Sequence, residues 1–320
     1  MRAGIRTVTV NIVGLAVAAS VAIAAGLHFQ HAENAVPPPQ FGGKQQPLLG
    51  YLGLYEPTSP SSYSGIAQFS RLIGHNPNIV VYYSSWWEPF QLNFAEASHA
   101  HHAIPMVQIE PRGVSLSAIA AGQYDSYLRA YARAVRSFGH PVILSFGHEM
   151  NADWYGWGYG HTRPSIFVAA WQHIHELFAA QGARSVIWLW AVNVVGGRHT
   201  TAIKEWWPGA AYVTWLGIDG HYFQPNLRFA GLFGATLDQV HRLSKDPVLI
   251  AEAGIAPSVG TAKIGDLFSG AQAHGLLGVV WFDVQGHNLR VVDNPPAIAA
   301  FRLVAAKYLR QTGTALARSR

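Results

Sequence analysis

Residues 124–146, YDSYLRAYARAVRSFGHPVILSF, contain the repeating unit that decides the fold. In the first part, apolar side chains recur at spacings of three and four residues, as on the buried face of a helix: Tyr127, Leu128, Tyr131, Ala132 and Val135. Gly139 stands where such a helix would end in a left-handed residue. The run Val142–Phe146 then has the length and apolar character of a buried strand. The stretch therefore predicts a helix followed by a strand of a parallel sheet.

The same alternation extends over the rest of the chain from residue 48. Eight apolar runs predict strands: Leu48–Leu54, Ile79–Tyr83, Ile104–Ile109, Val142–Phe146, Ser185–Trp190, Val213–Ile218, Val248–Ala251 and Gly278–Phe282. Helices are predicted between them: Tyr63–Ile73, Phe94–His102, Tyr124–Ser137, Pro164–Gln181, Leu237–Leu243, Ile264–His274, Pro296–Leu309 and, more weakly, Ala202–Trp207. Eight such units in about 260 residues favour a closed (β/α)8 TIM barrel over a doubly wound sheet.

The N-terminal segment is typical of an exported protein. Arg2 and Arg6 precede residues 8–27, which are almost wholly apolar. The pattern predicts a signal peptide or a signal anchor over residues 1–30, because about 20 apolar residues can also span a bilayer. In either form the remainder is extracellular, secreted or anchored to the outer face of the cytoplasmic membrane.

Three further segments follow this leader. Residues 31–47 are rich in Pro, Gly and Gln, which predicts an extended linker. Residues 48–312 are expected to form the catalytic domain, and residues 313–320 a basic C-terminal tail.

The composition excludes several classes of protein. Half of the 320 residues are hydrophobic and 12% are charged, so the chain is far too apolar to be disordered. It has no cysteine, which excludes disulfide frameworks, thiolate metal sites and cysteine nucleophiles. The formal net charge is +5, but Lys and Arg are scattered singly, so we expect no nucleic-acid partner. His148-Glu149 lacks the second histidine of a zinc-protease motif, because position 152 is alanine, and we expect no metal and no cofactor.

Polar and aromatic side chains stand where the predicted strands end, which is where a (β/α)8 barrel carries its active site. These positions are Glu110, His148–Asn151, Asn193, Asp219–Tyr222, Glu252, Trp281 and Asp283. Glu149 and Glu252 follow the fourth and seventh strands, where a carboxylate is costly to bury unless it faces a cleft or is paired. These strands lie across the barrel mouth from each other, so both carboxyl groups can reach one cleft. The alternative for either glutamate is a structural salt bridge at the rim.

Two carboxyl groups that flank a substrate are what glycosidic cleavage requires. One protonates the leaving oxygen, and the other attacks or stabilises the anomeric carbon. Glu149 lies in the segment Gly147–Gly160, GHEMNADWYGWGYG, whose aromatic rings can stack on sugars. The residues therefore predict a glycosidase.

This segment resembles the acid/base segment of glycoside hydrolase family 26, the mannanase and lichenase family, in His148-Glu149-Met150-Asn151 and Asp153-Trp154-Tyr155. Further similar stretches are residues 122–127, 207–209, 217–220, 251–254 and 280–283. The resemblance implies a retaining enzyme with Glu149 as acid/base and Glu252 as nucleophile. It also implies that His148 and Asn151 help to hold the sugar and the acid/base, and that Trp154 and Trp281 line subsites. The full expected substrate-binding set adds Trp157, Asn193, His221 and Tyr222.

The chain also departs from the family pattern. A tyrosine usually stands two residues after the aspartate of the sixth strand, but here that position is His221 and the tyrosine is Tyr222, so either could orient Glu252. Ser145 replaces a common arginine, and Ala152 a glycine. The resemblance implies β-1,4-mannan as the substrate. The alternatives are a mixed-linkage β-1,3/1,4-glucanase, an exopolysaccharide-tailoring glycosidase and a non-catalytic polysaccharide-binding protein of the cell surface.

Overall fold

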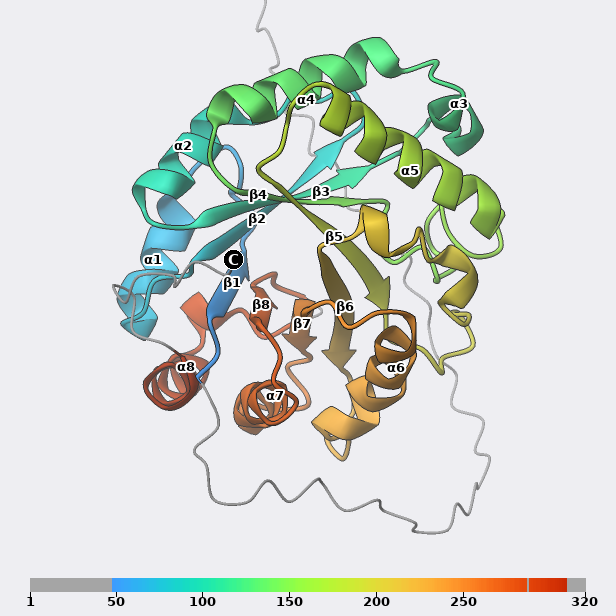
Figure 1. Ribbon diagram of the computed structural model, residues 1–320. Coiled ribbons are helices and arrows are strands. Elements are labelled where there is room, and N and C mark those ends of the chain that lie inside the picture. Colours follow the sequence, from blue (N-terminus) through green and yellow to red (C-terminus); the bar gives the residue numbers. More distant parts are fainter. Residues whose placement is uncertain (1–47, 287, 310–320) are drawn as a thin grey trace, which may run out of the picture. The chain divides into compact units, whose positions relative to one another are not determined.

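The computed structural model describes residues 48–286 and 288–309. In this part of the chain eight parallel strands form a closed barrel in sequence order, and helices surround it (Figure 1). The strands are β1 (Tyr51–Tyr55), β2 (Ile79–Ser85), β3 (Ile104–Glu110), β4 (Val142–Phe146), β5 (Val186–Asn193), β6 (Trp215–Tyr222), β7 (Val248–Ile255) and β8 (Gly278–Phe282). The predicted (β/α)8 barrel is confirmed.

The helices cover the outside of the barrel. They are α1 (Ser64–Ile73), α2 (Leu92–Ala100), α3 (Leu116–Ala120), α4 (Asp125–Phe138), α5 (Pro164–Ala180), α6 (Phe229–Leu243), α7 (Ala262–Ala273) and α8 (Pro295–Tyr308). Three short 3-10 turns are η1 (Lys204–Trp206), η2 (Ala210–Tyr212) and η3 (Val291–Asp293). Gly139 ends α4 in the left-handed conformation with φ 73°, as the sequence predicts.

Three helices differ from the sequence prediction. The weakly predicted helix over Ala202–Trp207 is only the 3-10 turn η1. The prediction missed α3, which is only five residues long, and it began α6 at Leu237 rather than at Phe229. Gly231 and Gly234 weaken the helix signal of the first half of α6. Packing outweighs that weak propensity, because Phe229 and Phe233 are buried on the same face as Leu237.

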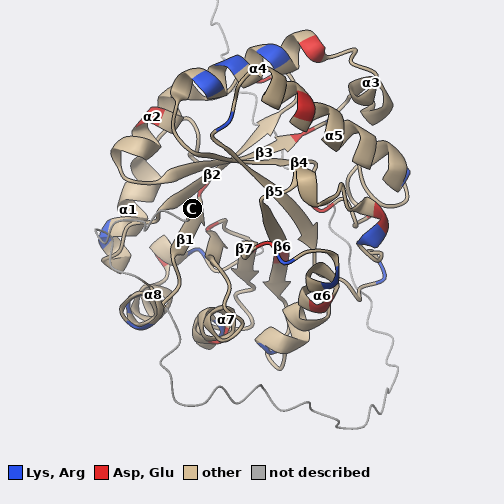
Figure 2. Ribbon diagram, in the orientation of Figure 1, with Lys and Arg blue, Asp and Glu red and all other residues tan. Residues whose placement is uncertain are grey.

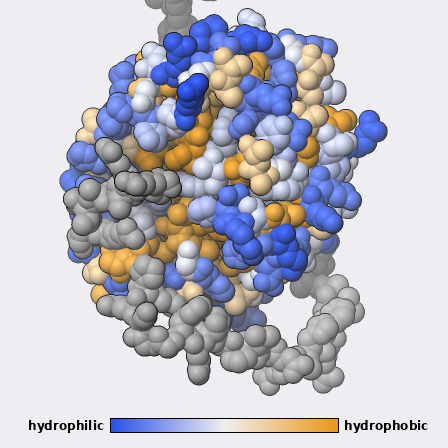
Figure 3. All heavy atoms as spheres, in the orientation of Figure 1, coloured by the Kyte–Doolittle hydropathy of each residue, from blue (hydrophilic) through white to orange (hydrophobic). Residues whose placement is uncertain are grey.

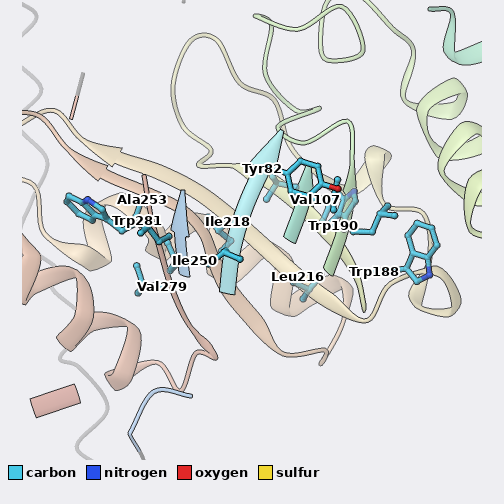
Figure 4. Packing of buried hydrophobic residues seen from close by; sticks show 14 of the residues in the cluster. Tyr82, Val107, Trp188, Trp190, Leu216, Ile218, Ile250, Ala253, Val279 and Trp281 are labelled. Atoms are coloured by element: carbon cyan, nitrogen blue, oxygen red, sulfur yellow. The ribbon is translucent and has the colours of Figure 1, made fainter. Parts of the chain in front are cut away.

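Side chains of the strands alternate between two apolar clusters. The barrel interior contains Ile79, Val81, Met106, Ile143, Leu189, Ala191, Trp215, Leu249, Ala251 and Val280. The outer cluster fills the space between barrel and helices and includes Tyr82, Val107, Trp190, Leu216, Ile250 and Trp281 (Figure 4). Because successive residues of a strand face opposite sides, the position of each residue in its strand decides whether it can reach the barrel mouth.

Charge is spread over the outer surface. Figure 2 shows Lys and Arg scattered over the outer helices, with several on α4. Hydrophilic and hydrophobic residues are mixed on the face drawn in Figure 3.

Several predicted segments lie outside the described residues: the leader 1–30 with its apolar stretch 8–27, the linker 31–47 and the tail 313–320. The domain limits 48–312 stay a prediction. Among the residues that are described, no helix has the length and apolar character needed to cross a membrane.

Candidate active site

Glu149 lies in a sharp turn just beyond β4. Its φ is 55°, in the left-handed region that non-glycine residues rarely adopt, and Gly147 has a φ of 56°. The Glu149 amide N–H donates to the Ala191 carbonyl at 2.9 Å, which ties the turn to β5. Such a backbone conformation persists only where the surroundings enforce it, and it is a frequent feature of active sites.

Both carboxyl oxygens of Glu149 accept a hydrogen bond. Asn193 at the end of β5 donates through Nδ2 to Oε1 at 2.6 Å, and Trp154 donates through Nε1 to Oε2 at 2.7 Å. Asn151 fixes Asn193, because its Nδ2 donates to the Asn193 carbonyl and its Oδ1 accepts from the Asn193 amide, each at 2.9 Å. The carboxyl group is therefore held in one orientation by neutral donors.

The pKa of Glu149 is raised above its ordinary value. Burial is the main cause, and the negative charge of Glu252 adds to it. The charge of His148 and the hydrogen bonds from Asn193 and Trp154 act in the opposite direction but do not outweigh burial. The Glu149 carboxyl group is thus suited to carry a proton.

Glu252 faces the barrel mouth because β7 is irregular. Ile250 and Ala253 both lie in the outer cluster, whereas Ala251 lies in the interior. Strict alternation would place Glu252 on the outer face with Ile250. The register of β7 shifts against both β6 and β8 at this point, as at a β-bulge, and a bulge can redirect a side chain. Glu252 consequently follows Ala251 on the inner side.

Two side chains hold the Glu252 carboxyl group. The Tyr83 hydroxyl at the end of β2 donates to Oε2, and His221 Nε2 on β6 lies 3.0 Å from Oε1. The other ring nitrogen of His221, Nδ1, lies 3.0 Å from Asn288 Oδ1. Both nitrogens thus face oxygen acceptors, an arrangement that suits the protonated imidazolium.

The pKa shifts of this pair run opposite to that of Glu149. Burial alone would raise the pKa of Glu252, but the hydrogen bond and charge of His221, together with the Tyr83 hydrogen bond, hold it below its ordinary value. Burial alone would lower the pKa of His221, but the hydrogen bond and charge of Glu252 raise it. Glu252 is therefore kept ionised.

The two glutamates belong to one site. The charge of Glu252 raises the pKa of Glu149, so the groups interact through space. Tyr83, which binds Glu252, contacts the ring of His148 edge-on at 5.5 Å, and His148 precedes Glu149 in the chain. Both glutamates lie close to the carboxyl ends of their strands, and that both carboxyl groups reach one cleft stays a prediction.

Polar side chains also line the interior near the two glutamates. Gln108, Ser145 and Asp219 are at most 1% exposed, and their side-chain polar atoms have no protein hydrogen-bond partner. Gln108 is the register partner of both Tyr83 and Ser145. Burial and the charges of both glutamates raise the pKa of Asp219 well above its ordinary value, which favours the neutral carboxyl group.

The structure contradicts the expected substrate-binding role of three residues. Trp281 is fully buried, contacts Phe301 of α8 and donates to Asp283 Oδ1 at 3.1 Å, so it packs in the outer cluster (Figure 4). Tyr222 is also fully buried, and its hydroxyl donates to Asp266 at 3.0 Å. It faces outward because it neighbours the inward His221, which is therefore the residue that orients Glu252.

Trp157 is the third residue whose expected substrate-binding role the structure contradicts. It is 3% exposed, stacks on Tyr155 at 4.3 Å and donates through Nε1 to the His148 carbonyl at 2.8 Å. Its ring stabilises the loop that carries Glu149 and offers no free face to a sugar. Arg112 lies over the same two rings and binds Glu110 at 2.7 and 2.8 Å, so Glu110 forms a salt bridge beside this loop.

The other expected residues lie at the site. Trp154 is 43% exposed beside Glu149, and Asn193 and His221 bind the two glutamates directly. His148 is 2% exposed with Nε2 3.3 Å from the Tyr155 hydroxyl, and Asn151 is fully buried. Asn151 therefore acts on Glu149 through Asn193.

The sequence prediction missed Tyr83 and Asn288. Tyr83 could have been found, because it ends the second predicted strand. The residues around it, however, do not distinguish it from an ordinary strand tyrosine. Asn288 lies beyond β8 and gives no sequence signal. In the described part of the chain, no group of three or more His, Cys, Asp or Glu side chains could hold a metal ion.

Comparison with known proteins agrees with the resemblance noted in the sequence. Residues 115–285 match the family described as Glycosyl hydrolase family 26. The chain belongs to glycosyl hydrolase family 26. Endoglucanase H of Acetivibrio thermocellus is 27% identical over 269 residues, which cover 78% of this chain and 30% of that protein. A mannan endo-1,4-beta-mannosidase of Bacillus subtilis is 29% identical over 123 residues, which cover 36% of this chain and 31% of that protein.

Solved structures share the fold. A GH26 beta-mannanase from Bacteroides ovatus has a TM-score of 0.63 at 13% identity, covering 83% of this chain and 91% of that one. Bacillus subtilis mannanase man26 has a TM-score of 0.61 at 16% identity, covering 83% of this chain and 86% of that one. The matches to these two curated relatives span less than a third of their lengths.

Proposed function

We propose that this family 26 protein is a retaining endo-β-1,4-mannanase with Glu149 as acid/base and Glu252 as nucleophile. The observation that carries the proposal is a pair of interacting carboxyl groups, one buried and one largely buried, whose pKa values are shifted in opposite directions. Environments that separate the pKa values of two carboxyl groups assign one as the acid and the other as the ionised partner.

In the first step, Glu252 attacks the anomeric carbon while Glu149 gives its proton to the leaving oxygen. The glycosidic C–O bond breaks, and an ester bond forms between the sugar and a Glu252 oxygen. His221 and Tyr83 hold the nucleophile, and Asn193 and Trp154 hold the acid. Glu149 leaves this step ionised.

In the second step, Glu149 removes a proton from a water molecule, whose oxygen attacks the anomeric carbon and displaces Glu252. The product keeps the anomeric configuration of the substrate, and both glutamates return to their starting protonation states.

Mannan is the substrate that appears most often in the names of the curated relatives. Three of the curated relatives are named mannan endo-1,4-beta-mannosidases, while others are named Endoglucanase H or beta-1,3-xylanase. We further propose that the enzyme acts outside the cytoplasmic membrane, on the basis of Arg2, Arg6 and the apolar residues 8–27.

The test is release of reducing ends from a panel of β-mannan, mixed-linkage β-glucan and β-1,3-xylan, with proton NMR of the first-formed anomer. Hydrolysis of mannan with retained configuration is expected. Cleavage of glucan or xylan alone would replace the substrate, inversion would overturn the mechanism, and no cleavage of any polysaccharide would overturn the enzymatic proposal.

A further inference from the structure

The exposed aromatic rings of this protein are concentrated at the catalytic end of the barrel. Among the described residues, seven large hydrophobic side chains are exposed, and four of them are aromatic: Trp87, Trp154, Tyr159 and Phe223. Trp87 follows β2, Trp154 and Tyr159 follow β4, and Phe223 follows β6. The carboxyl ends of parallel strands meet at one end of a barrel, so all four rings surround the mouth that contains the glutamates.

Phe223 lies next to the residue that orients the nucleophile. Its ring stacks on His221 with centroids 5.9 Å apart and an interplanar angle of 16°, and His221 binds Glu252. Phe223 is nevertheless 59% exposed. Burial of apolar surface is favourable, so an exposed ring beside a site is stabilised when a ligand covers it.

Trp87 is equally exposed, at 59%, and its backbone is strained. Its φ is 78°, which is an outlier for a bulky residue. Tyr124 and Tyr127 contact its ring edge-on, each at 5.3 Å between centroids, and the Tyr127 hydroxyl donates to the Glu88 carbonyl at 2.9 Å. The ring is thus presented to solvent by a supported loop.

We infer that Trp87 and Phe223 are stacking platforms for outlying sugar units of one polysaccharide chain. β2 and β6 are four strands apart in a closed barrel of eight, so the two platforms lie on opposite sides of the mouth. A chain that runs from one platform to the other crosses the site of Glu149 and Glu252. Aromatic faces suit the C–H faces of pyranose rings. The identity of the ligand rests on the proposed function.

The test compares Trp87→Ala and Phe223→Ala with Leu303→Ala, a control on α8 whose side chain is 73% exposed. Each aromatic variant should lose about tenfold in kcat/KM on mannan and on long oligosaccharides, the loss that 1.4 kcal/mol produces. The shortest oligosaccharide that is cleaved should show little change. Trp87→Phe and Phe223→Tyr should recover much of the loss, and Leu303→Ala should match the wild type.

A second measurement separates this inference from the proposed function. The variants are combined with Glu149→Gln, and their retardation is measured in native gels that contain mannan or β-glucan. If the wild type cleaves mannan and both alanine variants match it at every chain length, the inference is overturned. If the wild type cleaves nothing but is retarded, and the alanine variants are not, the platforms stand and the proposed function falls. Absence of both cleavage and retardation overturns both.

Discussion

Glu149 and Glu252 are the same residue type, each close to the carboxyl end of a barrel strand, yet they differ in backbone geometry and in hydrogen-bond partners. Glu149 reaches the mouth through a left-handed backbone turn after β4, whereas Glu252 reaches it through a bulge within β7. Neutral donors, Asn193 and Trp154, hold Glu149, and an imidazole and a phenol, His221 and Tyr83, hold Glu252.

The difference shows that the pKa of a carboxyl group depends on the charge of its partner as well as on burial. Glu149 is buried and the Glu252 side chain is only 14% exposed, and removal from water raises the pKa of each. The positive charge of His221 is sufficient to reverse the direction for Glu252, while the donors around Glu149 are too weak to do so. One residue type can therefore fill the two different roles that the proposed mechanism gives to Glu149 and Glu252.

Removal of each glutamate should have the largest effect and should separate their roles. We expect Glu252→Ala to lose about 10³-fold or more in kcat on every substrate, because no covalent step is possible. Glu149→Ala should lose a similar factor on mannan but much less on an aryl glycoside, whose leaving group needs no proton. The measurement is kcat on both substrates. Equal losses for the two variants on the aryl glycoside would contradict the assignment.

The partners of the glutamates should control opposite limbs of the pH profile. His221→Gln removes the charge that lowers the pKa of Glu252, so the acid limb of kcat/KM should move to higher pH, with a loss of about tenfold at the optimum. Asn193→Ala removes a hydrogen bond that lowers the pKa of Glu149, so the alkaline limb should move to higher pH. Complete profiles of both variants check this. An acid limb moved by Asn193→Ala would exchange the two roles.

Asp219 offers a smaller effect that is mainly on stability. Its pKa in the folded protein lies well above the ordinary 3.8, so folding takes up a proton and stability falls as pH rises from about 4. Asp219→Asn removes this pH-dependent loss of stability. The melting temperature of the variant should exceed that of the wild type by about 2–4 °C for each kcal/mol of unfolding free energy gained. The gain should grow as the pH rises above about 4, and activity should change by less than about tenfold. A gain that shrinks with rising pH would mean that Asp219 is ionised and paired.

Trp281→Phe should have the smallest effect on catalysis. The substitution leaves the Asp283 carboxyl group short of one buried donor, which costs about 1–3 kcal/mol of unfolding free energy. KM for mannan should be unchanged because Trp281 is fully buried. Trp154→Phe is the matched control, since its indole contacts Glu149 and its loss should change the kinetics. A raised KM with unchanged stability in Trp281→Phe would mean that Trp281 contacts the substrate.

Much of the architecture could be predicted because it depends on local patterns. All eight strands were found from short apolar runs, and α4 from the spacing of residues such as Leu128, Tyr131 and Val135. The strand ends then directed attention to Glu149 and Glu252 without reference to any family. The early part of α6 was missed because its glycines weaken the helix pattern in the sequence, and the helix there is stabilised by packing.

The sequence by itself determined the barrel and the two candidate glutamates, because hydrophobic periodicity and strand ends are local properties of the chain. Only the tertiary structure decided which neighbours those glutamates meet. Trp281 and Tyr222 turned out to face the helices. His221 and Tyr83 converged on Glu252 from two different strands, and Asn288, from beyond β8, contacts His221. Contacts of that kind depend on strand parity, on one bulge and on barrel closure, which bring together residues that are distant in sequence.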